Sequence, residues 1–303
     1  MEILTYILGL LLLISLGLLF RGRVTNKPLL SVAEKAEELS RVNKELNSSN
    51  KLLVEREIEL NETNKKLREI DARKSEFVSI VAHQLRTPLA AVKWTLDLLI
   101  NGDMGTLPDH QKSLLFKVID SNERMIRFVN DLLSVSRVES GRLEYTFVPI
   151  NLQHVAESVL LDIYPLANKK DININFRGKG MTLPSVAADT EKIRAVFQNL
   201  LENSVKYTSI NGHITLELRN RMNDVLVSVQ DDGIGIPKEE QKAIFNRFYR
   251  GSEAIKNQAE GSGLGLYLAK AIVEGHGGKI WFESEIGKGA TFYFTIPVPR
   301  KTR

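Results

Sequence analysis

The chain has 303 residues, of which 43% are hydrophobic and 26% are charged. This composition is typical of a globular protein with enough apolar material for one or two cores, and it excludes a disordered chain. The absence of cysteine excludes disulfides, thiolate metal sites and a cysteine nucleophile, and it is natural in a reducing compartment. The net charge of +4 comes from Lys and Arg residues interleaved with acidic residues, so the composition gives little support for a nucleic-acid partner.

Residues 1–21 are predicted to form a membrane anchor. The stretch from Ile3 to Phe20 is uncharged and largely apolar, and as a helix it would reach about 27 Å, close to the thickness of the bilayer core. A cleaved signal peptide, the alternative, has a shorter apolar region behind a basic segment, whereas here the basic residues Arg21, Arg23 and Lys27 follow the apolar run. By the positive-inside rule we expect a single-pass protein of the plasma membrane, with its N-terminus outside and everything after Arg21 in the cytoplasm.

Residues 22–70 carry a seven-residue leucine repeat. Most of the intervening positions are polar or charged, which is the pattern of a coiled-coil seam. Polar residues such as Asn43 and Asn50 follow the leucines by four positions, and polar groups there favour one register and a dimer at some cost in stability. A solvated single helix is the alternative, but it would have no use for leucines in phase. The repeat consists of Leu39, Leu46, Leu53, Leu60 and Leu67.

Residues 71–145 are predicted to form a helical hairpin. Apolar residues from Phe77 to Leu99 keep three- and four-residue spacings, and a second such stripe runs from Leu114 to Leu132. Between the stripes, the segment from Asn101 to Thr106 supplies a turn, Pro108 suits the first position of the returning helix, and Gly141 suits its end. A single hairpin could not bury both stripes, so we expect two copies of the chain to form a four-helix bundle and the protein to be a homodimer.

Residues 146–303 change to a mixture of helix and strand patterns. We expect a mixed sheet covered by helices on one face, which makes this part an α/β sandwich domain. Helices are predicted over 151–169 and from Asp189 or Thr190 to about Lys206, because either residue can cap a helix. Strands are predicted over 172–176, 214–218, 225–229, 280–282 and 292–296.

A histidine lies on the first arm of the predicted hairpin, five residues before a proline. The segment reads Phe77-Val-Ser-Ile-Val-Ala-His83-Gln-Leu-Arg-Thr-Pro88, and the proline should bend the helix beside His83, because it removes the backbone donor for the carbonyl of Gln84. Neutral imidazole is a nucleophile near pH 7, which suits a reversible phosphoryl carrier. The segment resembles the phosphoacceptor box of the HisKA-type domain in membrane-anchored sensor histidine kinases of two-component systems. This resemblance implies that His83 accepts the phosphate.

Two neighbours of His83 bear on the expected reaction. The family generally has an acidic residue directly after the histidine, whereas this chain has Gln84, whose amide can hold the imidazole ring but cannot take a proton at neutral pH. The resemblance therefore implies a slower autophosphorylation, or one that uses solvent as the base. Thr87 matches the position that the family uses to align a water for removing phosphate from the partner protein.

Four separated motifs resemble, in the right order, the GHKL-type HATPase domain that binds ATP in these kinases. In the first motif, Asn199 and Asn203 share one face of the predicted helix. The resemblance makes Asn203 the ligand of Mg²⁺, a reasonable role for an amide oxygen. It also puts Asn199 and Lys206 near the phosphates, with Tyr207 following in the nucleotide site.

The second motif, Asp231-Asp-Gly-Ile-Gly, follows a predicted strand. Its two glycines allow a close backbone approach to a ligand. The resemblance assigns Asp231 to the exocyclic amine of adenine and has Gly233 and Gly235 shape the adenine pocket.

The third and fourth motifs are an aromatic box and a glycine-rich loop. The resemblance gives Phe245 and Phe248 packing roles at the nucleotide site and gives Arg250 a contact with the γ-phosphate. A glycine-rich loop that opens a helix presents backbone amides to phosphate, and residues 252–260 between the two motifs are predicted to be a mobile lid over the nucleotide. The loop residues are Gly261, Gly263, Leu264 and Gly265, and the histidines that fit no motif, His110, His154, His213 and His276, are predicted to be surface or structural.

Together the motifs, from about Ser75 to Pro299, imply an ATP- and Mg²⁺-dependent protein-histidine kinase. It would autophosphorylate on His83 and pass the phosphate to an aspartate of a response regulator, with the route within one protomer or across the dimer left open. A kinase-impaired scaffold or phosphatase is one alternative, and Gln84 favours it. An ATPase of the gyrase, Hsp90 and MutL type is another, but it would need a glutamate where Asn199 stands.

Overall fold

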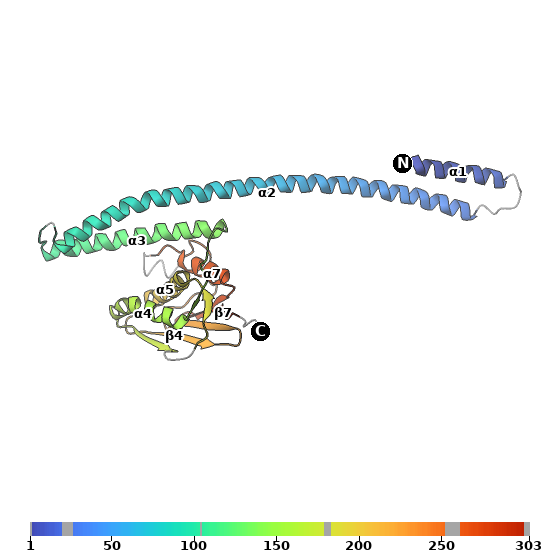
Figure 1. Ribbon diagram of the computed structural model, residues 1–303. Helices are drawn as coiled ribbons and strands as arrows, with labels where there is room; N and C mark the ends of the chain where they lie inside the picture. The colour runs from blue at the N-terminus through green and yellow to red at the C-terminus, as the bar shows by residue number, and fades with distance from the viewer. Residues whose placement is uncertain (1, 20–26, 104, 179–182, 252–260, 300–303) are drawn as a thin grey trace. The chain divides into compact units, whose positions relative to one another are not determined.

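The computed structural model describes residues 2–19, 27–103, 105–178, 183–251 and 261–299. They fall into two compact units, Met1–Ile70 and Asp71–Arg303. Figure 1 shows the order of the elements along the chain.

The first unit is helical. It contains α1 (Glu2–Leu19) and the first part of α2 (Lys27–Asn101). The leucines of the seven-residue repeat lie on α2 and are exposed to between 53% and 67%, so the predicted helix is confirmed while its coiled-coil partner stays a prediction. Within the described residues, no helix combines the length and the apolar character that crossing a membrane requires. Phe20, Arg21 and Arg23 of the predicted anchor lie outside the described residues.

The second unit begins with the predicted helical hairpin, formed by the end of α2 and by α3 (Asp109–Glu139). Ala82 of α2 packs with Val129 and Leu133 of α3, which joins the two arms. The helix continues through Pro88, and the bend expected there stays a prediction. Pro108 caps α3 instead of occupying its first turn, and Gly141 follows the helix with a left-handed φ of 65°.

The rest of the second unit is an α/β domain, as predicted. Its main sheet has the strand order β2-β4-β5-β7-β6, in which β2 and β4 are parallel and the other neighbours are antiparallel. A pair of short antiparallel strands, β1 and β3, was not predicted. The elements are β1 (Val148–Ile150), α4 (Leu152–Asn168), β2 (Asn173–Arg177), β3 (Val186–Ala188), α5 (Thr190–Tyr207), β4 (His213–Asn220), β5 (Asp224–Asp231), α7 (Gly265–Gly275), β6 (Ile280–Glu285) and β7 (Gly289–Pro297).

One face of this sheet carries the core. Helices α4, α5 and α7 gather on that face (Figure 1), and alternate strand residues point towards them. In β4 and β5, Leu216 lies opposite Val229 and Leu218 opposite Val227, and all four side chains are buried. The predicted one-sided mixed sheet is therefore confirmed.

Two of these helices begin at side-chain caps, and for α5 the cap is Asp189, one of the two residues predicted for it. The Asn151 side chain accepts a hydrogen bond from the backbone N–H of Gln153 at 2.8 Å, and the Asp189 carboxylate accepts one from that of Lys192 at 3.1 Å. The second cap sets the start of α5, the helix that carries the asparagine motif.

Candidate nucleotide and phosphoacceptor site

Helix α5 brings the asparagine motif against the glycine-rich loop. Phe197, Leu200 and Leu201 on its buried face are fully inaccessible, which holds Asn199 and Lys206 on the opposite, partly exposed side. A methyl group on Gly265 would lie 2.6 Å from Asn199 Oδ1, and one on Gly261 would lie 2.8 Å from Lys206 Nζ. The first and fourth motifs, about 60 residues apart, thus form one site.

Asp231 ends β5 as a buried carboxylate, 6% exposed. Its Oδ1 accepts hydrogen bonds from the backbone N–H groups of Gly233 at 3.1 Å and Ala290 at 3.2 Å, and its Oδ2 accepts one from the Ser204 hydroxyl at 3.4 Å. Burial raises the pKa of this carboxyl, while the three hydrogen bonds oppose the rise. A carboxylate can accept about four hydrogen bonds, and the described residues donate three of them to Asp231. One acceptor position, on Oδ2, is therefore left for a donor of the ligand.

The glycines after Asp231 are required by close backbone contacts. A methyl group on Gly233 would lie 2.5 Å from the carbonyl oxygen of Tyr207, at the end of α5. Gly235 has a φ of 71°, and a methyl group there would lie 2.1 Å from the carbonyl oxygen of Glu285. The second motif is therefore packed between α5 and the β6–β7 turn, as a pocket wall requires.

The aromatic box meets the prediction only in part. Phe245 packs against the core, with its ring 5.9 Å from that of Phe282. Phe248 turns the chain with a φ of 60° and its side chain is 52% exposed, so its packing role at the nucleotide site stays a prediction. Its backbone instead abuts the glycine-rich loop, where a methyl group on Gly263 would lie 2.7 Å from the Phe248 carbonyl carbon. Arg250 is partly buried beyond it, and the predicted lid, 252–260, lies outside the described residues.

The candidate phosphoacceptor is accessible. His83, Gln84 and Thr87 are all exposed on α2. The Thr87 hydroxyl donates to the backbone carbonyl of His83 at 3.5 Å, a long bond that leaves the imidazole ring unconstrained by it. The side chain can therefore meet a phosphoryl donor from solvent.

Sequence reasoning read His276 only as surface or structural, and the structure assigns it a supporting role. This buried imidazole accepts a hydrogen bond at Nε2 from the backbone N–H of Asp189 at 3.0 Å and donates from Nδ1 to the carbonyl of Ile272 at 2.7 Å. Tyr145 and Phe147 pack edge-on against the ring. His276 thus holds the cap of α5, a tertiary role that no local pattern signals.

The donor groups fit a nucleotide with a divalent cation. Lys206 and the amides of the glycine-rich loop suit phosphate, and Asp231 suits an amine donor. Within the described ranges, no group of three His, Asp or Glu side chains could hold a metal ion by itself. A Mg²⁺ ion at Asn203 would therefore take phosphate oxygens and waters as its other ligands, which is the coordination that Mg²⁺ prefers.

Two family models match the chain. The model described as "His Kinase A (phospho-acceptor) domain" matches residues 73–141, and that described as "Histidine kinase-, DNA gyrase B-, and HSP90-like ATPase" matches residues 188–300. Sensor histidine kinase WalK of Bacillus subtilis is 35% identical over 75% of this chain. The chain spans only 37% of the length of that relative.

Solved structures agree with this assignment. Full-length ShkA, in complex with AMPPNP, is 28% identical with a TM-score of 0.61, over 73% of this chain and 45% of that one. Histidine kinase ThkA, in complex with response regulator protein TrrA, is 26% identical with a TM-score of 0.51, over 75% of this chain and 63% of that one. The chain carries an accessible histidine on a helical hairpin, followed in sequence by an α/β domain whose donor groups suit a nucleotide. It belongs to the sensor histidine kinases of two-component systems.

Proposed function

We propose that this chain is an ATP-dependent protein-histidine kinase that phosphorylates itself on His83 and passes the phosphate to an aspartate of a response regulator. The observation that carries the proposal is the exposure of His83 on α2, within the segment that matches the phosphoacceptor model. ShkA binds AMPPNP and ThkA binds a response regulator, which supports a nucleotide and a receiver as ligands of this chain too.

Each site residue then has a role in this reaction. ATP supplies the phosphoryl group, and Asn203 would hold a Mg²⁺ ion that would offset the charge of the phosphates. Asp231 accepts from the adenine amine, while Asn199, Lys206 and the glycine-rich loop hold the phosphates. A ring nitrogen of His83 attacks the γ-phosphorus, the bond from that phosphorus to the β,γ-bridging oxygen breaks, and ADP leaves. Arg250 balances the charge that develops. Because Gln84 cannot take a proton, the departing proton goes to solvent.

A labelling experiment tests this function. A fragment covering 71–303 is incubated with γ-labelled ATP and Mg²⁺, alongside the His83→Ala and Gln84→Glu variants. We expect acid-labile, base-stable label that His83→Ala abolishes and Gln84→Glu increases. No label in the wild-type fragment, but label in Gln84→Glu, would favour the kinase-impaired alternative, a scaffold or a phosphatase that uses Thr87.

We further propose that the protein acts as a homodimer. The leucines of the repeat are more than half exposed, and so are Phe77 and Leu114 on the two arms of the hairpin. A second copy would cover these residues in a coiled coil and a four-helix bundle. Light scattering of the purified protein should report a dimer, and a monomer at micromolar concentration would contradict this proposal.

A membrane anchor at residues 1–21, with the kinase region in the cytoplasm, is also part of the proposal. It rests on the sequence alone, through the apolar run and the basic residues after it. Alkaline extraction of cell membranes should leave the full chain in the pellet and release a chain that begins at residue 28. Release of both would contradict the anchor.

A further inference from the structure

The end of α5 is completed by a lysine from another part of the chain. Lys170 lies in the turn between α4 and β2. Its ammonium donates hydrogen bonds to the carbonyl oxygens of Val205 and Lys206, each at 2.9 Å, and of Thr208 at 3.3 Å. An ammonium group has three N–H donors, so all three are used. Burial lowers the pKa of Lys170, as expected for a cation whose donors face the protein instead of water.

These bonds satisfy carbonyls that the helix itself leaves without a partner, because the last carbonyls of a helix have no N–H group within it to accept from. In α5 the carbonyl of Ser204 accepts from the N–H of Thr208 at 2.9 Å. The carbonyl of Tyr207 accepts from the N–H of Ile234, in the second motif, at 3.3 Å. Lys170 supplies the donors for the two carbonyls between them. The last turn of α5 is therefore held by Lys170 together with the second motif.

The same turn carries three contacts of the candidate nucleotide site. The Ser204 hydroxyl donates to the Asp231 carboxylate at 3.4 Å. The carbonyl of Tyr207 abuts the first glycine of the second motif, and Lys206 Nζ lies 2.8 Å from where a methyl group on Gly261 would be. Contacts expected for adenine and for phosphate thus depend on one helical turn.

The backbone around Lys170 is also joined to the segment that follows α5. The Lys170 carbonyl accepts from the N–H of Asn211 at 3.0 Å, and the N–H of Asn173 donates to the carbonyl of Gly212 at 2.9 Å. Strands β2 and β4 then pair in parallel, beginning with Asn173 opposite His213. The turn that carries Lys170 is therefore fixed next to the end of α5.

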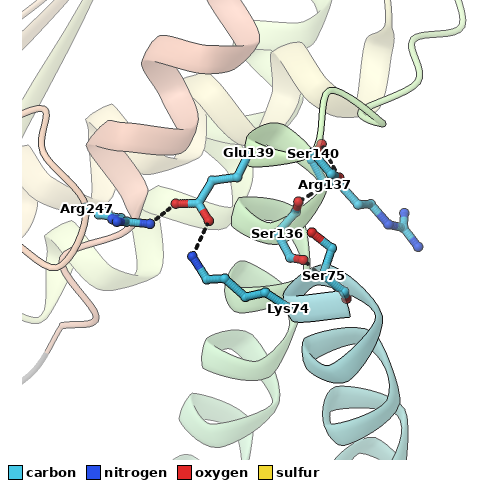
Figure 2. A network of polar contacts seen from close by, with 7 residues as sticks. All are labelled: Lys74, Ser75, Ser136, Arg137, Glu139, Ser140 and Arg247. Atoms are coloured by element: carbon cyan, nitrogen blue, oxygen red, sulfur yellow. Dashed lines mark hydrogen bonds and ion pairs between the residues drawn. The ribbon is translucent and has the colours of Figure 1, made fainter. Parts of the chain in front are cut away.

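The kind of acceptor decides what the loss of the Lys170 ammonium would do. In the network at the end of α3, the Glu139 carboxylate bonds to Lys74 Nζ at 3.0 Å and pairs with Arg247 (Figure 2). Each of those side chains can turn to water if its partner is lost. The acceptors of Lys170 are main-chain carbonyls, which cannot turn away separately, so their loss of a donor favours opening of the last turn of α5. Opening would displace the site contacts on that turn.

From these contacts we infer that Lys170 is a positioning residue for the nucleotide, whose ammonium keeps the last turn of α5 in the form that binds ATP. It acts through Ser204, Lys206 and Tyr207 and not by contact with the ligand. The inference deepens the proposed function and rests on it for the identity of the ligand. Because an open turn does not bind, the apparent dissociation constant rises as the closed fraction falls. Bound ATP closes the turn, so phosphoryl transfer at saturating ATP does not depend on Lys170.

The test compares Lys170→Met with Lys169→Met, at the exposed neighbouring lysine, in the full chain. Methionine keeps most of the side-chain length but has no N–H donor. With His83→Ala added, calorimetry should show ATP binding about five- to twentyfold weaker in Lys170→Met and within about twofold of the parent in Lys169→Met. With His83 present, autophosphorylation should show KM raised by the same factor and kcat within about twofold. Unchanged ATP affinity in Lys170→Met would overturn the inference.

A second control separates positioning from a general loss of stability. Val159→Ala truncates a fully buried side chain of α4 and should lower the melting temperature of the domain. Its ATP affinity should stay within about twofold of the parent, because the end of α5 keeps its donors. Equal weakening of ATP binding by Val159→Ala and Lys170→Met, at equal melting temperature, would refute the positioning role.

A chemical rescue is possible because the natural chain has no cysteine. Alkylation of Lys170→Cys by 2-bromoethylamine restores a three-donor ammonium on a side chain of nearly the same length. ATP binding should be weak before alkylation and return to within about threefold of the parent afterwards, with the modification confirmed by mass spectrometry. Failure to recover in the fully modified protein would contradict the inference. If the parent binds ATP but acquires no label on His83, the proposed kinase function fails instead, which separates the two failures.

Discussion

Replacing Asp231 by asparagine should weaken ATP binding while leaving the domain folded. In the variant, the amide oxygen can still accept from the N–H groups of Gly233 and Ala290, and the amide nitrogen can donate to the Ser204 hydroxyl. The internal hydrogen bonds therefore survive. The ligand position on Oδ2, however, becomes an N–H donor that faces the donor amine of adenine.

The size of the loss follows from this mismatch. A hydrogen bond to a charged group contributes about 1.5 to 3 kcal/mol, so ATP should bind roughly 10- to 150-fold more weakly. ITP has an acceptor oxygen where ATP has the amine, and it should lose much less affinity. Calorimetric titration in a His83→Ala background measures both nucleotides without turnover. Asp232→Asn, at the exposed neighbouring carboxylate, is the control and should bind ATP almost as the parent does.

Stability provides an independent check of the same reasoning. Because burial raises the folded-state pKa of Asp231 above its unfolded value, the wild-type protein loses stability as pH rises through the folded pKa. The Asp231→Asn variant lacks this loss. The difference in unfolding free energy, variant minus wild type, should therefore be more positive at pH 8 than at pH 4. A folded variant that binds ATP within threefold of wild type would refute the role assigned to this carboxylate.

Three further substitutions test how the site is held. His276→Ala should lower the unfolding free energy by about 3 to 5 kcal/mol in urea denaturation, because it leaves the partly buried N–H of Asp189 without this partner and removes two ring contacts. A change below about 1 kcal/mol would contradict this. Gly235→Ala should lower the unfolding free energy by several kcal/mol, since its methyl group would lie 2.1 Å from the Glu285 carbonyl oxygen. Gly287 has a similar φ of 75° but open space around it, so Gly287→Ala should lower the unfolding free energy by only about 1 kcal/mol. The melting temperatures of the two variants compare them directly, and equal shifts would be inconsistent with the clash. Asp189→Asn should destabilise the domain at pH 7 and progressively less below pH 4. Burial opposes ionisation of Asp189, but backbone hydrogen bonds and the charge of Lys192 hold its folded-state pKa below the usual range. The stabilisation that the carboxylate provides therefore disappears as pH falls through that pKa. Urea denaturation at several pH values checks this, and a pH-independent difference would contradict it.

Much of the candidate site could be read from local patterns. The capped start of α5 at Asp189, the paired strands β4 and β5, and the helix that follows the glycine-rich loop all come from periodicity and capping within short windows. The chemical roles came from motif resemblance, because two asparagines on a helix or one Asp-Gly turn carries little information alone. Local patterns did not anticipate the turn at Phe248, where the backbone has a positive φ and the side chain is exposed, because no residue-type rule predicts that conformation for phenylalanine.

Local patterns predicted most of the helices and strands, because helix periods, caps and turn residues act over a few neighbours along the chain. The roles proposed for the site residues rest on motif resemblance. The parallel pairing of β2 with β4 and the support that His276 gives to the cap of α5 became visible only in the folded chain. These contacts join segments far apart in the chain. Their free energy depends on how whole helices and sheets pack, a quantity that no local pattern encodes.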